Sequence, residues 1–132
     1  MILRFKENSR YSLGIRISDD HMDVMLFNLY CEIIDRKRYS YEEGTAFESI
    51  ITLLEQATEE MLLANKVNKA NLLGIGIVVP GLVDEKQLLL ISAPNLGVAN
   101  YAFEPLMTRL GVPVYIENDA NAAAYAELLI GN

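Results

Sequence analysis

Cysteine and histidine are scarce in this 132-residue chain, which has one of each, Cys31 and His21. A single cysteine excludes an internal disulfide and any metal site built from several thiolates. A single histidine excludes a cluster of imidazole ligands, so the sequence assigns no metal-binding residue. Cys31 lies in an apolar stretch, and we expect it to be a small core residue rather than a nucleophile.

Long hydrophobic runs and an excess of basic residues are also missing. No apolar stretch approaches the roughly 18 residues of a transmembrane helix, and the N-terminus has no hydrophobic signal-peptide region. Lysine and arginine total 11 against 18 aspartate and glutamate residues, a net charge of −7. This balance argues against binding of the segment itself to a nucleic-acid backbone, which needs clustered basic residues. We expect a cytoplasmic protein with no membrane partner.

Hydrophobic residues make up 52% of the chain, enough for the core of one domain at this length. The first half predicts three closely spaced strands at residues 11–18, 22–28 and 30–41, an arrangement typical of a meander. Apolar residues at helical spacing then predict a helix. Thr45 and Glu48 have the spacing of a capping box and should mark where this helix begins.

The second half alternates strands and helices. Residues 72–79 are almost wholly apolar, as in a central strand covered on both faces, and residues 88–92 form a further short apolar run. A short helix at 103–110, a buried strand at 114–116 and an alanine-rich helix at 120–129 follow. The pattern indicates an α/β fold, with a mixed sheet that begins as a three-strand meander and continues with alternating strands and helices.

Two of these strands end in residues suited to hold a ligand. The strand at 72–79 runs into Gly81, and the strand at 114–116 runs into Asn118 and Asp119. If the two strands are parallel neighbours, both ends open on the side of the sheet where α/β proteins bind ligands. The amide and the carboxylate would then grip and deprotonate a hydroxyl beside the backbone at Gly81. Asn and Asp are also preferred helix N-caps, and the local pattern leaves both interpretations open.

Three stretches together resemble the ROK family (repressors, open reading frames and sugar kinases): GIGIVVPGLVD at 74–84, APNLG at 93–97 and GVPVYIENDANAAAYAE at 111–127. They occur in the family's order and spacing. The resemblance implies a ribonuclease-H-like, actin-like ATPase lobe over residues 11–132, preceded by a flexible lead-in at residues 1–10. It covers only the N-terminal lobe of a ROK domain.

The resemblance also assigns roles to four residues. In the family's kinases the Asp of the Asn-Asp pair is the general base, which corresponds to Asp119 here. Asn118 would hold a neighbouring sugar hydroxyl, and Gly81 would lie against the sugar. Asn95 would line the same cleft. A cluster of polar groups suits a sugar because discrimination depends on pairing each hydroxyl.

One departure from the family's kinases concerns the phosphate loop between the first two strands. The kinases have Asp-x-Gly-Gly-Thr there. This chain has Arg16 in place of the Asp, Ser18 and Asp19 in place of the glycines, and Asp20 where Thr would be. Glycines let backbone amides approach a phosphate, and two carboxylates facing a triphosphate would repel it. ATP is therefore not expected as a cofactor, and the loop looks like that of the family's sugar-responsive repressors.

The resemblance thus implies the sugar-sensing lobe of a ROK transcriptional regulator, with a sugar or sugar phosphate as ligand. The family's N-terminal DNA-binding region would lie outside this fragment, as would its C-terminal lobe with a Cys/His zinc motif. DNA would be bound only through that N-terminal region. Apolar surface left uncovered on one lobe favours a homo-oligomer. A ROK sugar kinase with Asp119 as general base, and a scaffold without a ligand, remain alternatives.

Overall fold

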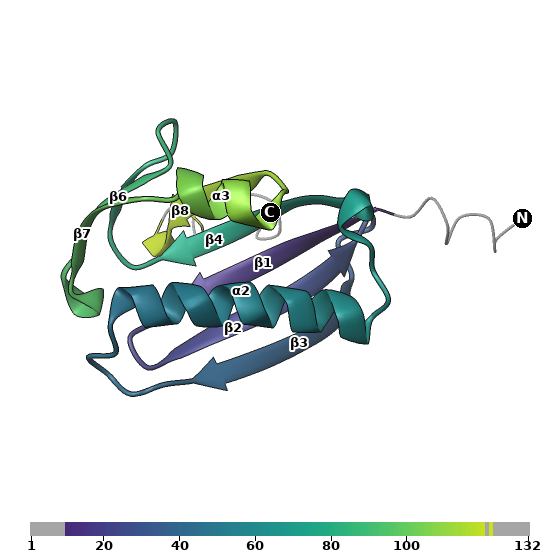
Figure 1. Ribbon diagram of the computed structural model, residues 1–132, viewed down its shortest axis with the longest axis horizontal. Helices are drawn as coiled ribbons and strands as arrows, with labels where there is room; N and C mark the ends of the chain where they lie inside the picture. The colour runs from purple at the N-terminus through teal and green to yellow at the C-terminus, as the bar shows by residue number, and fades with distance from the viewer. Residues whose placement is uncertain (1–9, 121, 123–132) are drawn as a thin grey trace, which may run out of the picture.

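The computed structural model describes residues 10–120 and residue 122 (Figure 1). Five strands form the larger sheet: β1 (Tyr11–Ile17), β2 (His21–Asn28), β3 (Ile33–Ser40), β4 (Leu72–Val79) and β8 (Val114–Asn118). Three shorter strands form a second sheet: β5 (Leu82–Asp84), β6 (Leu89–Ala93) and β7 (Val98–Ala102). The helical segments include α2 (Phe47–Ala64), α3 (Glu104–Leu110) and the 3₁₀ helices η1 (Lys69–Asn71) and η2 (Pro94–Leu96).

The larger sheet is mixed, with the strand order β3-β2-β1-β4-β8. β1, β2 and β3 pair antiparallel through short connections, which confirms the predicted meander. β4 lies parallel to β1, and β8 lies parallel to β4. Parallel neighbours need a crossover connection, and the segment between β4 and β8 contains the whole smaller sheet and α3. The carboxyl ends of β1, β4 and β8 therefore meet at one end of the sheet.

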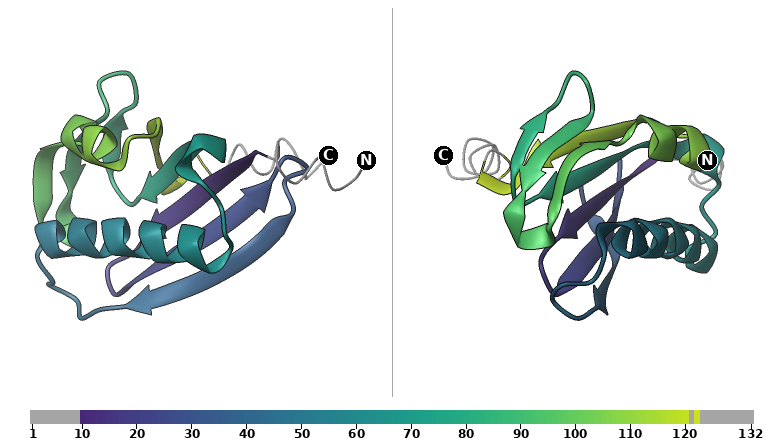
Figure 2. Two further views of the ribbon diagram at one scale, coloured as in Figure 1. Left: turned by 45° about the vertical axis from the view of Figure 1, so that its right-hand side comes forward. Right: turned by 60° about the vertical axis from the view of Figure 1, so that its left-hand side comes forward.

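One face of the larger sheet packs against α2 (Figure 2). Successive residues of a strand point to opposite faces, so apolar side chains alternate along β1 and β2. The buried set is Leu13, Ile15, Ile17, Met22, Val24 and Leu26. The predicted helical stripe of α2 packs on it through Phe47, Ile50, Ile51, Leu54, Ala57, Met61 and Leu62. Truncating one large side chain of this core to alanine would cost about 2–5 kcal/mol.

The capping-box prediction at the start of α2 is wrong. The residue before the helix is Ala46, and no side chain caps it. The Thr45 hydroxyl donates instead to the backbone carbonyl of Glu42. The helix begins at Phe47, whose ring packs edge-to-face on Tyr101 of β7 at a centroid separation of 4.9 Å. Aromatic packing of this kind stabilises the first turn in place of a side-chain cap.

The smaller sheet could be predicted only in part, because its strands are short and irregular. β6 covers most of the apolar run at 88–92, which the sequence pattern does not assign to an element, whereas β5 has only three residues and carries no periodic signal. Leu88 and Asn100 adopt left-handed backbone angles, at φ 53° and φ 55°, which interrupt the alternation next to β6 and within β7. Leu90 and Phe103 are nevertheless fully buried and join the main core.

Cys31 is exposed in the connection between β2 and β3, so its expected place in the core is wrong. The backbone turns there through a left-handed φ of 61° at Cys31. The side chain of Asn28 organises this turn by accepting hydrogen bonds from the backbone N–H groups of Tyr30 and Glu32. Because the turn occupies these residues, β3 begins at Ile33 and not at residue 30.

Two predicted segments fall largely outside the described residues. The lead-in at 1–10 is described only at Arg10, whose guanidinium donates a hydrogen bond to Asn71. The helix at 120–129 is described only at two positions. Within residues 10–120 and 122, no helix combines the length and the hydropathy that crossing a membrane requires.

Candidate functional site

The carboxyl ends of β4 and β8 lie side by side, pointing to the left in Figure 1. Their parallel register pairs Val78 with Glu117 and Val79 with Asn118. β4 then runs through Pro80 into Gly81, which brings Gly81 to Asn118. The arrangement on which the predicted ligand site depended, two parallel neighbouring strands, is therefore present.

Asn118 connects the two strand ends directly. Its side-chain Nδ2 donates a hydrogen bond of 2.9 Å to the backbone carbonyl of Gly81. Its backbone N–H donates to the Oε1 atom of Glu117 at 3.0 Å. Asn118 is partly buried, so both contacts are shielded from bulk water and hold the amide in one orientation.

Asp119 is the first residue after β8 with helical backbone, and its side chain is half-buried. A carboxylate at this place is near the ligand end of the sheet and retains the acceptor capacity that a general base needs. In the alternative interpretation the Asn-Asp pair only caps a helix, by accepting hydrogen bonds from the backbone N–H groups of the helical turn that follows. That turn lies mostly outside the described residues, so the roles of Asp119 stay predictions.

Gly81 has a structural reason to be glycine. A Cβ atom at this position would lie 2.4 Å from the carbonyl oxygen of Ser92 and 2.9 Å from the Cβ of Ala93. Real Cβ atoms do not approach other atoms so closely, so the turn after β4 packs on β6 only without a side chain. This close approach seats the smaller sheet at the ligand end of the larger one.

Asn95 is exposed in η2, two residues after Ala93. Asn118 contacts Gly81, and Gly81 packs against Ala93, which precedes η2. The described contacts thus connect Asn95 to Asn118 only through these intervening residues. Of the four residues assigned to a sugar, the structure brings together Gly81, Asn118 and Asp119. Asn95 lies on the adjoining element.

Glu85 is a residue at this site that sequence reasoning missed. It lies in the turn between β5 and β6, and its carboxyl hydrogen-bonds to that of Glu117. This contact raises the pKa of Glu85 above its ordinary value, with smaller contributions from the charge of Glu117 and from Asp84. No pattern in the sequence pairs a turn residue with a residue 32 positions further on.

The turn between β1 and β2, which corresponds to the kinase phosphate loop, is a tight hairpin. The Ser18 N–H donates to the carbonyl of His21 at 2.8 Å. The hydroxyl of Tyr41 lies 2.6 Å from the Ser18 carbonyl and 2.7 Å from the His21 carbonyl. Burial of this hydroxyl raises the pKa of Tyr41 to about 12. The Ser18 N–H and the carbonyls of Ser18 and His21 are thus bonded within the protein.

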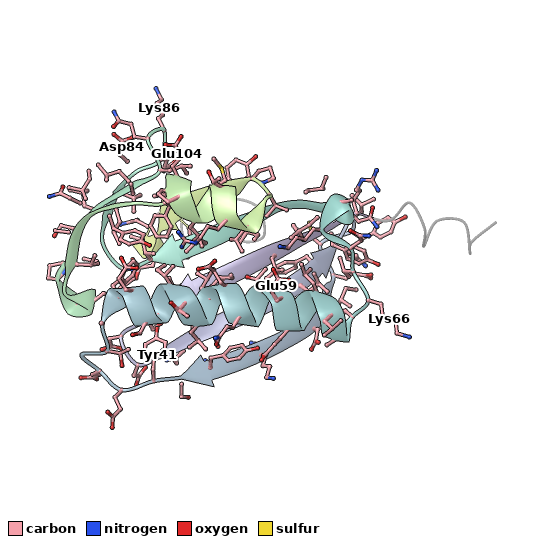
Figure 3. All side chains as sticks on the ribbon, in the orientation of Figure 1. Tyr41, Glu59, Lys66, Asp84, Lys86 and Glu104 are labelled. Atoms are coloured by element: carbon pink, nitrogen blue, oxygen red, sulfur yellow. The ribbon has the colours of Figure 1, made fainter. Side chains whose placement is uncertain are left out.

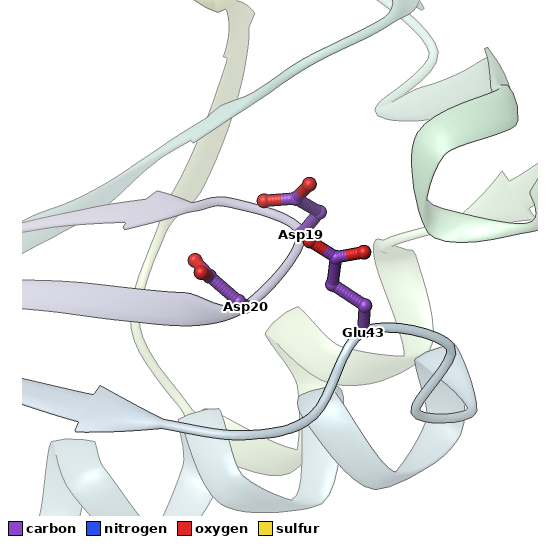
Figure 4. A group of neighbouring side chains, drawn as sticks. All are labelled: Asp19, Asp20 and Glu43. Atoms are coloured by element: carbon purple, nitrogen blue, oxygen red, sulfur yellow. The ribbon is translucent and has the colours of Figure 1, made fainter.

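Carboxylates surround the same turn. Asp19, Asp20 and Glu43 each place one oxygen within 4.8 Å of the others, and all three are exposed (Figure 4). Asp20 also contacts the His21 ring at 2.6 Å. Like charges at these separations give the turn a negative potential, which is unfavourable for a phosphate group.

Comparison with known proteins identifies relatives along the whole described chain. The family model described as "ROK family" matches residues 12–132. A putative xylose repressor of Caldicellulosiruptor sp. (strain Rt8B.4) is 32% identical over 132 residues, which cover 99% of this chain and 33% of the relative. The xylose repressor of Bacillus subtilis (strain 168) is 30% identical, over 99% of this chain and 34% of the relative. The chain thus spans about a third of the length of these curated relatives.

Solved structures give the same result for the fold. A ROK family transcriptional regulator, described as a homologue of the E. coli MLC protein, superposes with a TM-score of 0.79 at 26% identity, over 91% of this chain and 30% of that one. A ROK family glucokinase from Streptomyces griseus, solved with glucose and AMPPNP, superposes with a TM-score of 0.75 at 24% identity, over 89% of this chain and 36% of that one. Regulators and kinases of this kind have an actin-like ATPase fold, which confirms the predicted fold class.

Proposed function

This chain belongs to the ROK family, and from that premise we propose that it is the sugar-sensing lobe of a transcriptional regulator. Relatives named xylose repressor support this function, since two of them are at least 30% identical to the chain along nearly all its length. DNA would be bound by a part of the protein outside this chain, because the segment itself carries a net charge of −7.

The observation that carries the proposal is the closed turn between β1 and β2. A loop that holds nucleotide phosphates presents free backbone N–H groups and needs glycine to bring them close. In this turn Ser18 uses its N–H within the hairpin, Tyr41 holds two of its carbonyls, and Asp19 and Asp20 add negative charge. These groups do not fit a triphosphate, so ATP has no part in the proposed function.

The residues at the carboxyl ends of β4 and β8 fit a sugar. Asn118 and Asp119 offer an amide and a carboxylate, and a hydrogen bond from Asn118 holds the turn at Gly81 beside them. Such groups can donate to and accept from the hydroxyls of a sugar, as specific recognition requires. Xylose is the first sugar to test because of the relatives' names. A sugar that contacts both lobes of the full-length protein would bind more tightly when the lobes are closed around it than when they are apart. This difference in affinity alone would shift the protein toward the closed conformation.

Three further features belong to the same proposal. The Cys/His zinc motif that the family resemblance implies would lie in the C-terminal lobe, outside this chain. Self-association would cover apolar side chains that this lobe exposes, such as Tyr30 and Leu63. A regulator of transcription of this kind would act in the cytoplasm.

A sugar kinase is the second candidate function. One relative is the glucokinase of Halalkalibacterium halodurans, which is 24% identical over 94% of this chain and 38% of that protein. The half-buried Asp119 after Asn118 would then be the general base that takes the proton of the attacking sugar hydroxyl. This function requires a nucleotide site that the β1–β2 turn does not favour.

The test uses the full-length protein that contains this chain. Its affinity for DNA from upstream of its own gene is measured by fluorescence anisotropy with and without xylose, and ATP binding is measured by calorimetry. We expect a sugar-dependent change in DNA affinity and no saturable ATP binding. Saturable ATP binding together with sugar-dependent ATP consumption would instead establish the kinase function. Asp119→Asn, which should abolish phosphoryl transfer, is the matched control for that outcome.

A further inference from the structure

A groove of about 380 Å³ lies at the C-terminal end of α2, beside the turn that leads to η1. Figure 3 shows Glu59 on this part of α2 and Lys66 in the turn that follows the helix. The polar side chains that line the groove already have partners within the protein. Glu59 pairs with Lys69 at 2.7 Å, and the side-chain oxygen of Asn68 accepts the backbone N–H of Ala70. What the groove offers an occupant is therefore mainly its apolar lining.

Leucine and valine side chains form that apolar lining. Leu62 and Val67 are buried, whereas Leu63 is 81% exposed. Removing apolar surface of this kind from water is favourable. The groove therefore fits an occupant that brings apolar side chains of its own.

The described chain begins next to this groove. Arg10 donates a hydrogen bond of 3.2 Å to Asn71, the last residue of η1, and Lys69 at the start of η1 lines the groove. Residues 1–9 precede this anchored position and lie outside the described residues. Nine residues reach at most about 30 Å when extended, and the 18 residues of α2 span about 27 Å. The segment at 1–9 is therefore long enough to reach the whole groove.

The segment at 1–9, MILRFKENS, has the composition that such an occupant needs. Apolar and basic residues alternate from Leu3 to Lys6. In an extended segment, Leu3 and Phe5 would therefore lie on one side and the basic residues on the other. One side of the segment could then face the apolar lining while the other stays in water.

The charges of the segment and of its surroundings follow the same order. Glu7 is three residues from Arg10 and would lie on the η1 side, near Lys69. Arg4 and Lys6 are further from the anchor and would lie over α2, which has four glutamates and no basic residue. A second copy of the lobe that used the same groove would instead set these glutamates against each other. Charge therefore favours the chain's own first residues over a second copy.

We propose that this groove is an intramolecular docking site for residues 1–9, in which Leu3 and Phe5 cover Leu63. The segment would then be held against α2 instead of being the flexible lead-in that the sequence predicts. In the proposed regulator, docking would fix the direction in which the chain enters the lobe from the DNA-binding region. Self-association would then rely on other exposed side chains, such as Tyr30.

The experiment measures amide hydrogen exchange of residues 1–9 in the full-length protein by mass spectrometry. Leu63→Ser removes the apolar contact from the groove, and Phe5→Ser removes it from the segment. Leu82→Ser is the matched control, because it changes another leucine that is 61% exposed but lies in β5, at the opposite end of the sheet. All three side chains lie on the surface or outside the described core, so the variants should fold, which a thermal melt followed by circular dichroism verifies.

We expect residues 1–9 of the original protein to exchange about tenfold more slowly, or slower still, than a free peptide of the same sequence. Leu63→Ser and Phe5→Ser should each raise the exchange rate about threefold or more, and Leu82→Ser should leave it unchanged. The double variant should exchange no faster than the more affected single variant, because both changes remove the same contact.

Exchange as fast as in the free peptide would overturn the inference, and so would equal exchange in Leu63→Ser and Leu82→Ser. Sedimentation of the same variants detects the other occupant. If Leu63→Ser weakens self-association and leaves the exchange of residues 1–9 unchanged, a second copy covers the groove and the inference is wrong. None of these measurements involves a sugar or DNA, so their outcome is independent of the proposed function.

Discussion

The side-chain amide of Asn118 donates a 2.9 Å hydrogen bond to the backbone carbonyl of Gly81, across 37 residues of sequence. The bond ties the end of β8 to the turn that leaves β4. That turn in turn packs on Ser92 and Ala93 of β6 without room for a side chain. One contact thus connects the larger sheet, the smaller sheet and the candidate sugar site. Changes at the ligand end should therefore affect both binding and stability.

Replacing Asn118 with alanine removes the donor to Gly81. We expect the free energy of unfolding, measured by urea denaturation, to fall by about 0.5–1.5 kcal/mol. The sugar response of the full-length protein should weaken as well. Asn118→Asp keeps the size of the side chain but sets a carboxylate against a carbonyl, so it should cost at least as much. An Asn118→Asp protein as stable as the original would mean that this contact contributes nothing.

Gly81→Ala should destabilise the protein by about 1–3 kcal/mol, the usual cost of forcing atoms into packed space. The reason is the 2.4 Å separation between the added Cβ and the Ser92 carbonyl oxygen. Gly76→Ala is the matched control in β4, because no described atom lies within 4 Å of the Cβ it would add. Thermal denaturation of both variants should show a clear loss only for Gly81→Ala. Equal melting temperatures would contradict the close approach seen at Gly81.

Tyr41→Phe removes the hydroxyl that holds the β1–β2 turn. We expect a loss of about 1 kcal/mol in unfolding free energy, since the bond to the Ser18 and His21 carbonyls is half-buried. Amide hydrogen exchange in this turn should become faster. Tyr30→Phe is the control, because Tyr30 is 84% exposed and should tolerate the change. If both variants exchange alike, the Tyr41 hydroxyl does not stabilise the turn.

The pair between Asp23 and Arg38 predicts a pH dependence of stability. The Arg38 guanidinium, with its Nε 2.7 Å from Asp23, lowers the pKa of that carboxyl below its usual 3.8. The unfolded chain then binds the proton more tightly than the folded one. The stabilisation by the pair is therefore present above pH 3.8 and is lost as the pH falls through the folded-state pKa.

Urea denaturation of the original protein and of Asp23→Asn, from pH 7 to pH 3, tests this dependence. The difference in unfolding free energy between them should be largest at neutral pH and should shrink in acid. High salt should reduce it at pH 7, because the pair is partly exposed and is screened. A difference that grows as the pH falls would contradict the assignment.

Asp119→Ala should reduce the sugar response of the full-length protein while leaving it folded. If Asp119 also caps the helix that it begins, its loss would cost about 0.5–2 kcal/mol of stability. Sugar titration monitored by DNA affinity, together with a thermal melt, separates the two effects. An unchanged sugar response in a protein of lower stability would assign Asp119 to capping alone.

The part of the fold that could be predicted from sequence is the part with strong periodicity. β4 is apolar along its whole length, which indicates a strand buried on both faces. Its neighbour β8 ends in an abrupt polar cluster at Asn118. These signals predicted that Gly81 and Asn118 lie together if β4 and β8 are parallel neighbours. The meander of β1 to β3 also followed from short spacing between alternating runs.

The remainder depends on contacts that local patterns do not encode. Three-residue β5 has no period to detect, and the start of α2 is set by the packing of Phe47 on Tyr101, 54 residues away along the chain. Glu85 meets Glu117 only after the β5–β6 turn is placed against β8. Cys31 adopts a left-handed backbone in a turn built by Asn28, so its apolar neighbours misled the prediction of burial.

The Tyr41 hydroxyl also bears on how easily this protein could change its chemistry during evolution. Because it already occupies the carbonyls of Ser18 and His21, restoring glycines to the turn would not by itself free the loop for a nucleotide. Loss of the tyrosine hydroxyl and of nearby negative charge would be needed at the same time, and each single step would weaken the hairpin without yet gaining a new ligand. The turn therefore makes the gain of a nucleotide site a change of several steps, and a tyrosine at this position is a sequence marker to examine across the family.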